Sequence, residues 1–248
     1  MTRATSSVQR LHVEADLQAD AAIEMAPKQA HYVRNVLRLE AGAELWLFNG
    51  RDGEWRATLE VVSKKLVVAR AVEQLRQQDT PSDIWLLVAP VKKQRLDYLA
   101  QKATEMGAGK LVPIITKRTQ GGRVNLEKLV ANTIEAAEQC NIMSLPEVAD
   151  PIRLDVLLAD WANQGAARHI VFCDEAADSG TGASELAALK GKKLALLIGP
   201  EGGFDEGERA DLLARADSLP ISLGPRILRT DTAVVAALAL LQSQLGDW

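Results

Sequence analysis

The sequence predicts an α/β protein in which a small β-barrel precedes a mostly parallel sheet covered by helices. Three observations support this fold class. Apolar residues in the first third alternate at period two, as they do in half-buried strands. Residues 74–83 are polar, contain Pro81 and have no periodicity, which is typical of a linker. From Ile84 onward, short apolar runs alternate with amphipathic helical patterns.

The first domain, residues 1–75, is expected to consist mainly of short strands. Apolar residues alternate over 45–47 and again over 55–61, and another strand begins at Leu66. Asn-Gly and Asp-Gly dipeptides between the first two runs are strong turn signals. Short strands joined by tight turns favour a small barrel or sandwich.

One helix is expected within this domain, from Pro27 to about Leu39. Val33, Val36 and Leu37 would form its apolar stripe. The basic residues of the helix share another face: His31, Arg34 and Arg38.

The second domain, residues 80–248, is expected to alternate strands with helices. The predicted strands are residues 84–90, 111–115, 169–173, 194–198 and 221–223. The predicted helices are residues 96–106, 126–137, 154–161, 205–215 and 230–245. Asn125 and the Asp205/Glu208 pair are N-terminal capping signals, and Gly107 is a helix stop. Such alternation implies a mostly parallel sheet, whose ligands bind at the carboxyl ends of the strands.

The bulk properties narrow the class of protein. A hydrophobic fraction of 47% suffices for a substantial core, and no apolar run approaches the roughly 20 residues of a membrane span. The N-terminus lacks the apolar stretch of a signal peptide. The two cysteines are not in CxxC spacing, and no His/Cys/Asp spacing suggests a metal, so we expect a metal-free cytoplasmic protein. Because the net charge is −4, an RNA-binding role would need local basic patches.

Two segments near the end of the chain share one layout. LLIGPEGGF (196–204) and LGPRILRTDTA (223–233) each begin as an apolar strand, break into a Gly/Pro loop and restart as a helix. Glycine permits close backbone approach, so two such loops side by side would form a backbone-lined slot for a flat ligand with polar edges. An ordinary strand-to-helix connection is an equal alternative for the first loop alone. The many polar groups of the second loop favour a functional site.

The composition of these loops argues against a phosphate ligand. Neither loop matches GxxxxGK[ST], and neither gives GxGxxG after the first strand of its domain. Glu201 and Asp231 would repel a phosphate, so a ligand that carries positive charge fits better.

The segments HYVRNVLRL, KKQRLDYLAQKATEMG, EAAEQ, LLIGPEGGF and LGPRILRTDTA, in this order, resemble the RsmE-type ribosomal RNA uridine N3-methyltransferases of the SPOUT superfamily. The resemblance covers nearly the whole chain. It implies a PUA-like β-barrel that holds RNA, followed by a SPOUT domain: a trefoil-knotted, mostly parallel sheet with helices on both faces and the knot towards the C-terminus. It further implies a cytoplasmic homodimer that acts on 16S rRNA of the small ribosomal subunit, with neither membrane nor DNA as partner.

The cofactor implied by the resemblance is S-adenosyl-L-methionine (SAM), held among three loops: the end of HIVFCDE and the two Gly/Pro loops. Ile198, Leu223, Ile227 and Leu228 would provide apolar walls for adenine. The residues expected at the cofactor are Ile198, Gly199, Pro200, Glu201, Gly202, Gly203, Leu223, Gly224, Ile227, Leu228, Arg229, Thr232 and Ala233.

Methyl transfer to uracil N3 requires loss of a weakly acidic proton, so positioning and charge stabilisation should dominate. Arg226 and Arg229 are the candidates for stabilising negative charge on the base. Their alternative role is a salt bridge to Asp231 or Glu201. Glu138, Glu201 and Asp231 are candidate bases, among which the sequence does not choose, and Asp231 could instead favour the start of the last helix.

Three basic clusters are candidates for RNA contacts, against the alternative that they are ordinary solvated faces. They are His31, Arg34 and Arg38; Lys92, Lys93 and Arg95; and Lys117, Arg118 and Arg123, which bracket Gly121-Gly122.

One departure from the family pattern follows Gln139, where an arginine is usual and Cys140-Asn141 stand instead. Two alternatives to the leading function therefore stay open. One is a SPOUT methyltransferase with another RNA target, and the other is a non-catalytic RNA binder in ribosome assembly.

Overall fold

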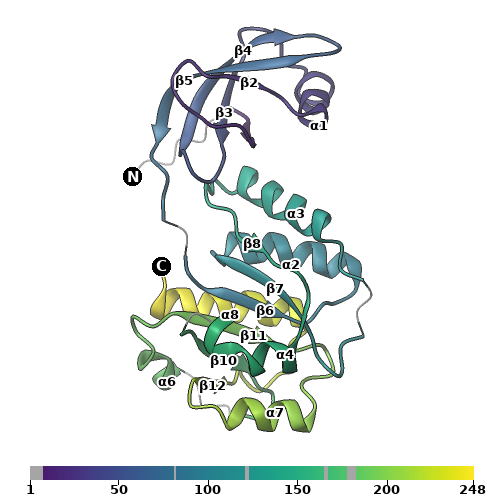
Figure 1. Ribbon diagram of the computed structural model, residues 1–248, viewed down its shortest axis with the longest axis vertical. Coiled ribbons are helices and arrows are strands. Elements are labelled where there is room, and N and C mark those ends of the chain that lie inside the picture. The colour runs from purple at the N-terminus through teal and green to yellow at the C-terminus, as the bar shows by residue number, and fades with distance from the viewer. Residues whose placement is uncertain (1–7, 81, 121–122, 165–166, 178–182) are drawn as a thin grey trace. The chain divides into compact units, whose positions relative to one another are not determined.

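The computed structural model describes residues 8–80, 82–120, 123–164, 167–177 and 183–248 (Figure 1). Gly121-Gly122 of the third basic cluster lie outside this part. The chain forms two compact units. The first comprises Met1–Thr80 and Ala137–Ser144, and the second comprises Pro81–Ala136 and Leu145–Trp248.

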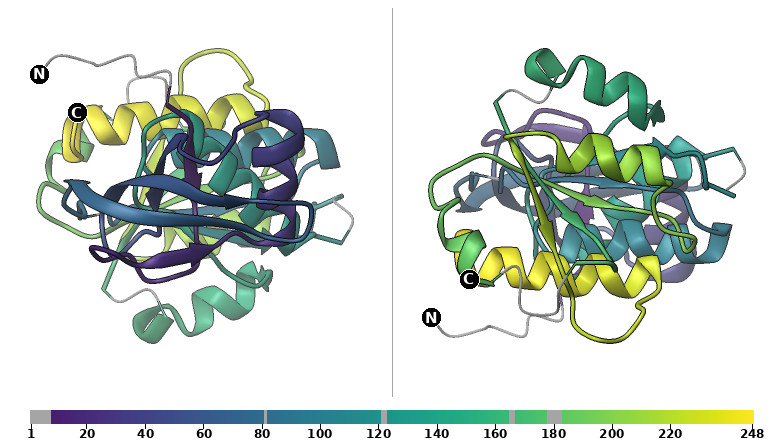
Figure 2. Two further views of the ribbon diagram at one scale, coloured as in Figure 1. Left: turned by 90° about the horizontal axis from the view of Figure 1, so that it is seen from above. Right: turned by 90° about the horizontal axis from the view of Figure 1, so that it is seen from below.

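The first unit is built on a curled five-stranded sheet. Its hydrogen-bonded order is β1 (Arg10–His12), β3 (Glu44–Phe48), β4 (Glu54–Val62), β5 (Val67–Arg76) and β2 (Ala22–Glu24). Only β1 with β3 is parallel, and β4 with β5 forms the long hairpin seen in Figure 2. The predicted alternation is confirmed, because Leu45, Leu47 and Leu59 are buried in this unit's core. The predicted linker starts too early: residues 74–76 belong to β5 and pair with the start of β4.

The predicted helix lies at the expected place but is not α-helical throughout. It comprises α1 (Pro27–His31) and one π-helical stretch, η1 (Tyr32–Val36), in which Leu37 N donates to Tyr32 O. Val33 is buried as predicted, whereas Val36 is 59% exposed, so the predicted stripe is wrong there. The wider i→i+5 turn changes which residues share a face, and the helix ends before Leu39.

Residues 137–144 belong to the first unit because buried polar groups hold them there. Arg10 Nη1 donates to Ala137 O at 2.6 Å, and its Nε pairs with Glu54 at 2.5 Å. Glu54 is only 1% exposed and also pairs with Arg76 at 2.9 Å. His12 N donates to Glu138 Oε1 at 2.9 Å. Glu54 thus joins two arginines, one of which caps the carboxyl end of a helix.

The second unit contains an all-parallel sheet, as predicted. Its order is β12 (Ser218–Ile221), β10 (His169–Cys173), β11 (Leu194–Ile198), β6 (Trp85–Val88), β7 (Lys110–Ile115) and β8 (Glu147–Val148), and β9 (Ile152–Arg153) pairs further along β7. The helices are α2 (Lys93–Glu105), α3 (Leu126–Gln139), α4 (Leu154–Ala159), α5 (Trp161–Gln164), α6 (Ala183–Ala187), α7 (Glu206–Leu213) and α8 (Thr230–Leu245).

Helices cover both faces of this sheet. Leu86 on one face belongs to a core that includes residues of α2 and α8, whereas the next residue, Leu87, belongs to a core with residues of α4 and α7. Figure 2 shows α7 and α8 on opposite sides of the sheet. Near-continuous apolar strands are expected when both faces are buried.

Most predicted helix boundaries in this unit are confirmed. Asn125 Oδ1 accepts from Lys128 N at 3.0 Å, Asp205 and Glu208 form the capping box of α7, and Gly107 has φ +74° just after α2. Three predictions are wrong in extent. The 154–161 helix breaks into α4 and α5 at Asp160, α7 ends at Leu213, and the last strand is Ser218–Ile221 rather than 221–223.

The shifted last strand has a local cause. Its residues pair with β10 from Ile170 to Cys173, and pairing ends at Ile221. Leu223, which resembled a strand residue, instead lines a pocket. Among the described residues, no helix is both long and apolar enough to cross a membrane.

Candidate functional site

A pocket of about 260 Å³ lies at the carboxyl ends of β10, β11 and β12. Its walls come from three consecutive strand ends: residues 173–177, the segment 198–204 and the segment 221–228, with the first turn of α8 as a further contribution. The structure therefore brings both Gly/Pro loops together at the edge where parallel sheets bind ligands.

The first Gly/Pro loop is a tight turn that folds back over an aromatic ring. Gly203 N donates to Pro200 O at 2.9 Å, and Gly203 has φ +67°, which favours glycine. A side chain at Gly199 would meet the Phe204 ring at 3.2 Å. Phe204 packs edge-on against Phe172 of β10, with ring centroids 6.1 Å apart. The packing of Phe204 against Phe172 and Gly199 therefore fixes the backbone of this loop.

The second Gly/Pro loop is tied to the first by a buried hydroxyl. Thr230 Oγ1 donates to Gly199 O at 3.2 Å. Between Ile221 and α8, Ser222 Oγ accepts from Gly224 N at 3.3 Å. Gly224 has φ +99°. The two loops thus meet through side-chain and backbone groups at the start of α8.

The third wall, at the end of β10, carries polar groups that the sequence analysis did not name individually. Asp174 is buried, and its Oδ2 accepts from Arg209 Nε of α7 at 2.9 Å. Burial raises the pKa of the neighbouring Cys173 thiol to about 12, so this thiol remains protonated at neutral pH. The carboxylate of Glu175 also lines the pocket. The sequence does carry one signal for Asp174 and Glu175, because both are polar residues that directly follow an apolar strand.

Most of the residues predicted at the cofactor line this pocket. They are Ile198, Gly199, Pro200, Glu201, Gly203, Leu223, Gly224, Ile227, Leu228 and Ala233. Gly202, Arg229 and Thr232 are not among the lining residues. Ile227 is 84% exposed, so it lies at the mouth of the pocket rather than within an apolar wall.

The structure separates the three candidate bases. Glu138 belongs to the first unit, where its Oε1 accepts from His12 N. Glu201 pairs with Arg95 of α2, with Oε1 3.0 Å from Nη1. Asp231 lies in the first turn of α8, and its buried Oδ1 has no hydrogen-bond partner among the described residues.

The two candidate arginines of the second loop remain available to a ligand. Arg226 lines the pocket and is exposed, and Arg229 is the exposed N-cap residue of α8. Within the described part of the chain, neither forms the predicted alternative salt bridge to Asp231 or Glu201. Arg95 takes that place at Glu201.

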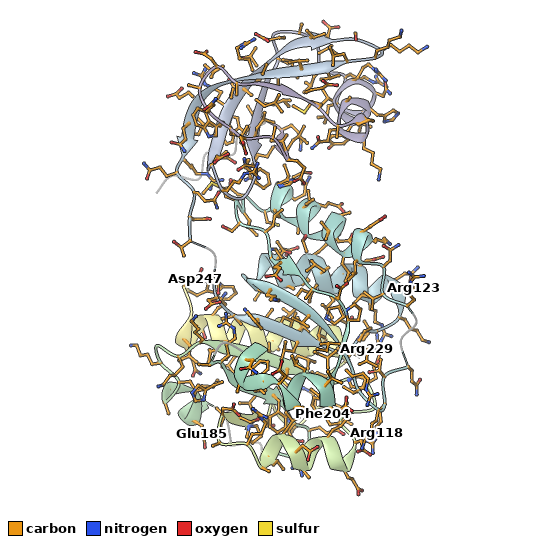
Figure 3. All side chains as sticks on the ribbon, in the orientation of Figure 1. Arg118, Arg123, Glu185, Phe204, Arg229 and Asp247 are labelled. Atoms are coloured by element: carbon orange, nitrogen blue, oxygen red, sulfur yellow. The ribbon has the colours of Figure 1, made fainter. Side chains whose placement is uncertain are left out.

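The predicted RNA-binding residues fall into two groups. Four already bind acceptors within the protein: Arg34 (Ser63 O and Lys64 O, both 2.8 Å), Arg95 (Glu201), Lys117 (Asp205, 2.6 Å) and Arg118 (Gly202 O, 2.9 Å). The exposed His31, Arg38, Lys92 and Arg123 have no such partner in the described ranges. The side chain of Lys93 lies outside the described part. Arg118, Arg123 and Arg229 appear along one side of the second unit in Figure 3.

Two basic residues escaped the sequence analysis. Lys64 and Lys65 form the exposed tip of the β4–β5 hairpin. The bonds from Arg34 to Ser63 O and Lys64 O hold this tip against η1, so both lysines join the helix's basic residues. No group of three or more potential metal ligands occurs among the residues that the structure describes.

Comparison with known families defines the class of protein. The family model described as an RNA methyltransferase domain matches residues 78–242, and that described as an RNA methyltransferase PUA domain matches residues 26–72. The chain belongs to this RNA methyltransferase family.

Two relatives with similar sequences carry the name of one particular RNA methyltransferase. The chain is 32% identical to the ribosomal RNA small subunit methyltransferase E of Rickettsia conorii, covering 93% of each chain. It is 28% identical to the protein of that name from Bacillus subtilis, covering 96% of this chain and 97% of the relative.

Solved structures show the same architecture. A methyltransferase of Legionella pneumophila, solved with bound SAM, is 30% identical, with a TM-score of 0.84 over 98% of this chain and 100% of the other. The ribosomal RNA small subunit methyltransferase E of Neisseria gonorrhoeae, also bound to SAM, is 25% identical, with a TM-score of 0.80 over 97% and 99%.

Proposed function

We propose that this protein is a SAM-dependent methyltransferase that methylates N3 of a specific uridine in 16S rRNA of the small ribosomal subunit. The observation that carries the proposal is the pocket formed by the loops after β10, β11 and β12. It occurs in a chain similar over nearly its whole length to a SAM-bound methyltransferase and to proteins named ribosomal RNA small subunit methyltransferase E.

The residues of the pocket fit the parts of SAM. Ile198, Leu223 and Leu228 offer apolar surface for the adenine ring, and loop backbone groups offer hydrogen bonds to its edge. The carboxylate of Glu175, together with that of Glu201 in its pair with Arg95, supplies negative charge beside the position of a cationic sulfonium. The volume of about 260 Å³ is close to the lower end of the roughly 300–1,000 Å³ typical of ligand pockets.

SAM would supply a methyl group on a sulfonium. The protein must place uracil N3 in line with the bond from sulfur to this methyl group and remove the proton from N3. Asp231 is the base that we favour among the three candidates, because its buried Oδ1 has no donor within the described part of the chain. Glu201 and Glu138 already accept hydrogen bonds from other residues. Arg226 and Arg229 stabilise the charge that develops on the uracil oxygens.

The RNA contacts belong to the basic groups that have no acceptor among the residues that the structure describes. In the first unit these are His31 and Arg38, with Lys64 and Lys65 at the hairpin tip. In the second unit they are Lys92, Arg123 and the two loop arginines. Exposed basic groups without a partner inside the protein gain most from a phosphate backbone, and their binding releases its counterions.

In this proposal the protein is cytoplasmic, because its substrate is the ribosomal subunit. We also propose that it is a homodimer. Tyr98 and Val130 are exposed apolar side chains on α2 and α3, and residues 233–241 of α8 are apolar nearly all round the helix. Light scattering coupled to size exclusion tests the dimer, and a monomer at micromolar concentration would contradict it. The trefoil knot stays a prediction from the family resemblance.

Two measurements test the function. Nucleoside mass spectrometry of 16S rRNA from a deletion strain should show N3-methyluridine lost, and restored by the gene. Unchanged N3-methyluridine would exclude the proposed target and leave another RNA as substrate. Calorimetry should show SAM binding to the purified protein, and no binding would favour a non-catalytic RNA binder.

A further inference from the structure

The segment after β7 closes on itself as a compact turn. Thr119 N donates to Thr116 O at 3.1 Å, and Thr116 N donates to Thr119 Oγ1 at 2.9 Å. Thr116 is buried. These reciprocal bonds hold the two residues between them, Lys117 and Arg118, at a fixed place beside the carboxyl end of the sheet.

Lys117 binds the start of α7 through both its side chain and its backbone. Its Nζ lies 2.6 Å from Asp205 Oδ1, and its N–H donates to Glu208 Oε1 at 2.8 Å. Glu208 is buried and also accepts from Asp205 N at 3.0 Å. One buried carboxylate therefore joins the turn after β7 to the residue that directly follows Phe204 of the first Gly/Pro loop.

Arg118 reaches the turn of the first Gly/Pro loop itself. Its Nη1 donates to Gly202 O at 2.9 Å. Its Cβ and Cδ lie 3.8 Å from the position that a side chain at Gly202 would occupy, so the aliphatic stem also covers this glycine. A charged donor on a carbonyl fixes the plane of the peptide between Gly202 and Gly203. That peptide carries the Gly203 N–H, which closes the turn onto Pro200 O.

We propose that Arg118 is a positioning residue for the SAM-binding loop, supported by Lys117, and not an RNA ligand. The inference rests on the proposed function, because it assumes that the pocket takes SAM. A loop that is already held in its bound shape loses less conformational freedom when the ligand arrives, so the ligand binds more tightly. The bond to Gly202 O commits Nη1 of the Arg118 guanidinium to the loop.

Arg123 offers a matched control, because it lies on the same connection between β7 and α3. It is exposed, and the structure gives it no acceptor among the described residues. Figure 3 shows both arginines on the same side of the second unit. The two residues therefore share charge and neighbourhood but differ in their bond to the loop.

The experiment compares wild type, Arg118→Ala, Arg118→Lys and Arg123→Ala in the full chain. Calorimetry should show the SAM dissociation constant raised about tenfold in Arg118→Ala, since a charge-assisted hydrogen bond is lost. Arg118→Lys, which can still donate, should recover part of this affinity. Arg123→Ala should leave the SAM dissociation constant unchanged, weaken RNA binding and reduce its salt slope by about one.

A second readout does not depend on SAM. Hydrogen exchange at the Gly203 amide should be faster in Arg118→Ala than in wild type, because the turn that protects it loosens. Unchanged SAM affinity and exchange in Arg118→Ala, with RNA binding weakened as in Arg123→Ala, would overturn the inference. Absence of SAM binding in wild type would instead overturn the proposed function, whereas faster exchange would still show that Arg118 holds the loop.

Discussion

The Oδ1 atom of Asp231 is buried and has no hydrogen-bond partner among the described residues. Such an atom costs stability unless something binds it, so it is best explained by the reaction or by a ligand. We expect Asp231→Asn to lower the turnover rate by about 10²- to 10⁴-fold, the range of general-base contributions. SAM affinity should stay within about twofold. Single-turnover methylation of 16S rRNA and calorimetry measure the two effects.

The neighbouring exposed Thr232 supplies the control for this prediction. Thr232→Ala should keep the turnover rate near that of wild type. A fully active Asp231→Asn would remove Asp231 from the mechanism and return the role to Glu201 or Glu138.

His12 makes the first unit sensitive to pH. Burial lowers the pKa of His12 below its ordinary value of 6.5, and the charge of Arg51 adds to this, while Glu14 opposes it. Between the unfolded and the folded pKa the unfolded chain binds more protons, so stability is full above pH 6.5 and falls as the pH drops below it. Urea unfolding followed at pH 7.5 and 5.5 should show this loss. It should be smaller in His12→Gln, and an equal loss in both proteins would rule out His12 as its source.

At the scale of elements, long patterns predicted the structure well and short ones did not. β3, β4, β10, β11, α2, α3 and α8 match their periodicity. β1, β2, β8 and β9 have only two or three residues, which is too few to show a period. The position of the helix that contains η1 was predicted correctly, but the residues that share its buried face were not. The sequence carries no signal for an i→i+5 turn.

The same distinction applies to the site. The glycines of both loops identified the pocket, because close approach and left-handed backbone restrict the residue type. The pairs Arg95–Glu201 and Asp174–Arg209 join residues far apart in the sequence, and no local pattern predicts them. Local signals therefore found the backbone of the site, while its side-chain connections required the tertiary structure.

The junction of α2 with α8 depends on a glycine. A side chain at Gly107 would lie 2.5 Å from Nε2 of the buried Gln242, which donates to Met106 O at 2.9 Å. We expect Gly107→Ala to lower the free energy of unfolding by about 2–4 kcal/mol, from left-handed strain plus displacement of Gln242.

Gly42→Ala is the control, because Gly42 also has positive φ but has nothing within 4 Å of the added carbon. It should cost only the backbone strain, about 1–2 kcal/mol. Urea denaturation curves measure both variants, and equal losses would mean that contact with Gln242 is unimportant.

At the scale of the whole molecule, the first unit is discontinuous in sequence. Residues 1–80 alone lack the carbonyls that Arg10 binds and the carboxylate that accepts from His12 N. We expect this fragment to unfold at lower urea concentration than the same fragment joined to residues 137–144 by a flexible linker. Each charge-assisted bond recovered contributes about 1.5–3 kcal/mol.

A fragment joined to a scrambled version of residues 137–144 controls for chain length. It should unfold like residues 1–80 alone. Equal midpoints for all three fragments would show that the returning segment adds nothing to the first unit.

The returning segment also sets the order of events during synthesis. The first unit begins the chain, yet its last residues leave the ribosome about 60 residues after Thr80. At elongation rates on the order of 5–20 residues per second, residues 137–144 follow Thr80 by roughly 3–12 s, and Arg10 waits at least that long for the Ala137 carbonyl. A nascent chain stalled before residue 137 should therefore carry an incomplete first unit, whose arginines are open to chaperones or to the ribosomal RNA around the exit tunnel.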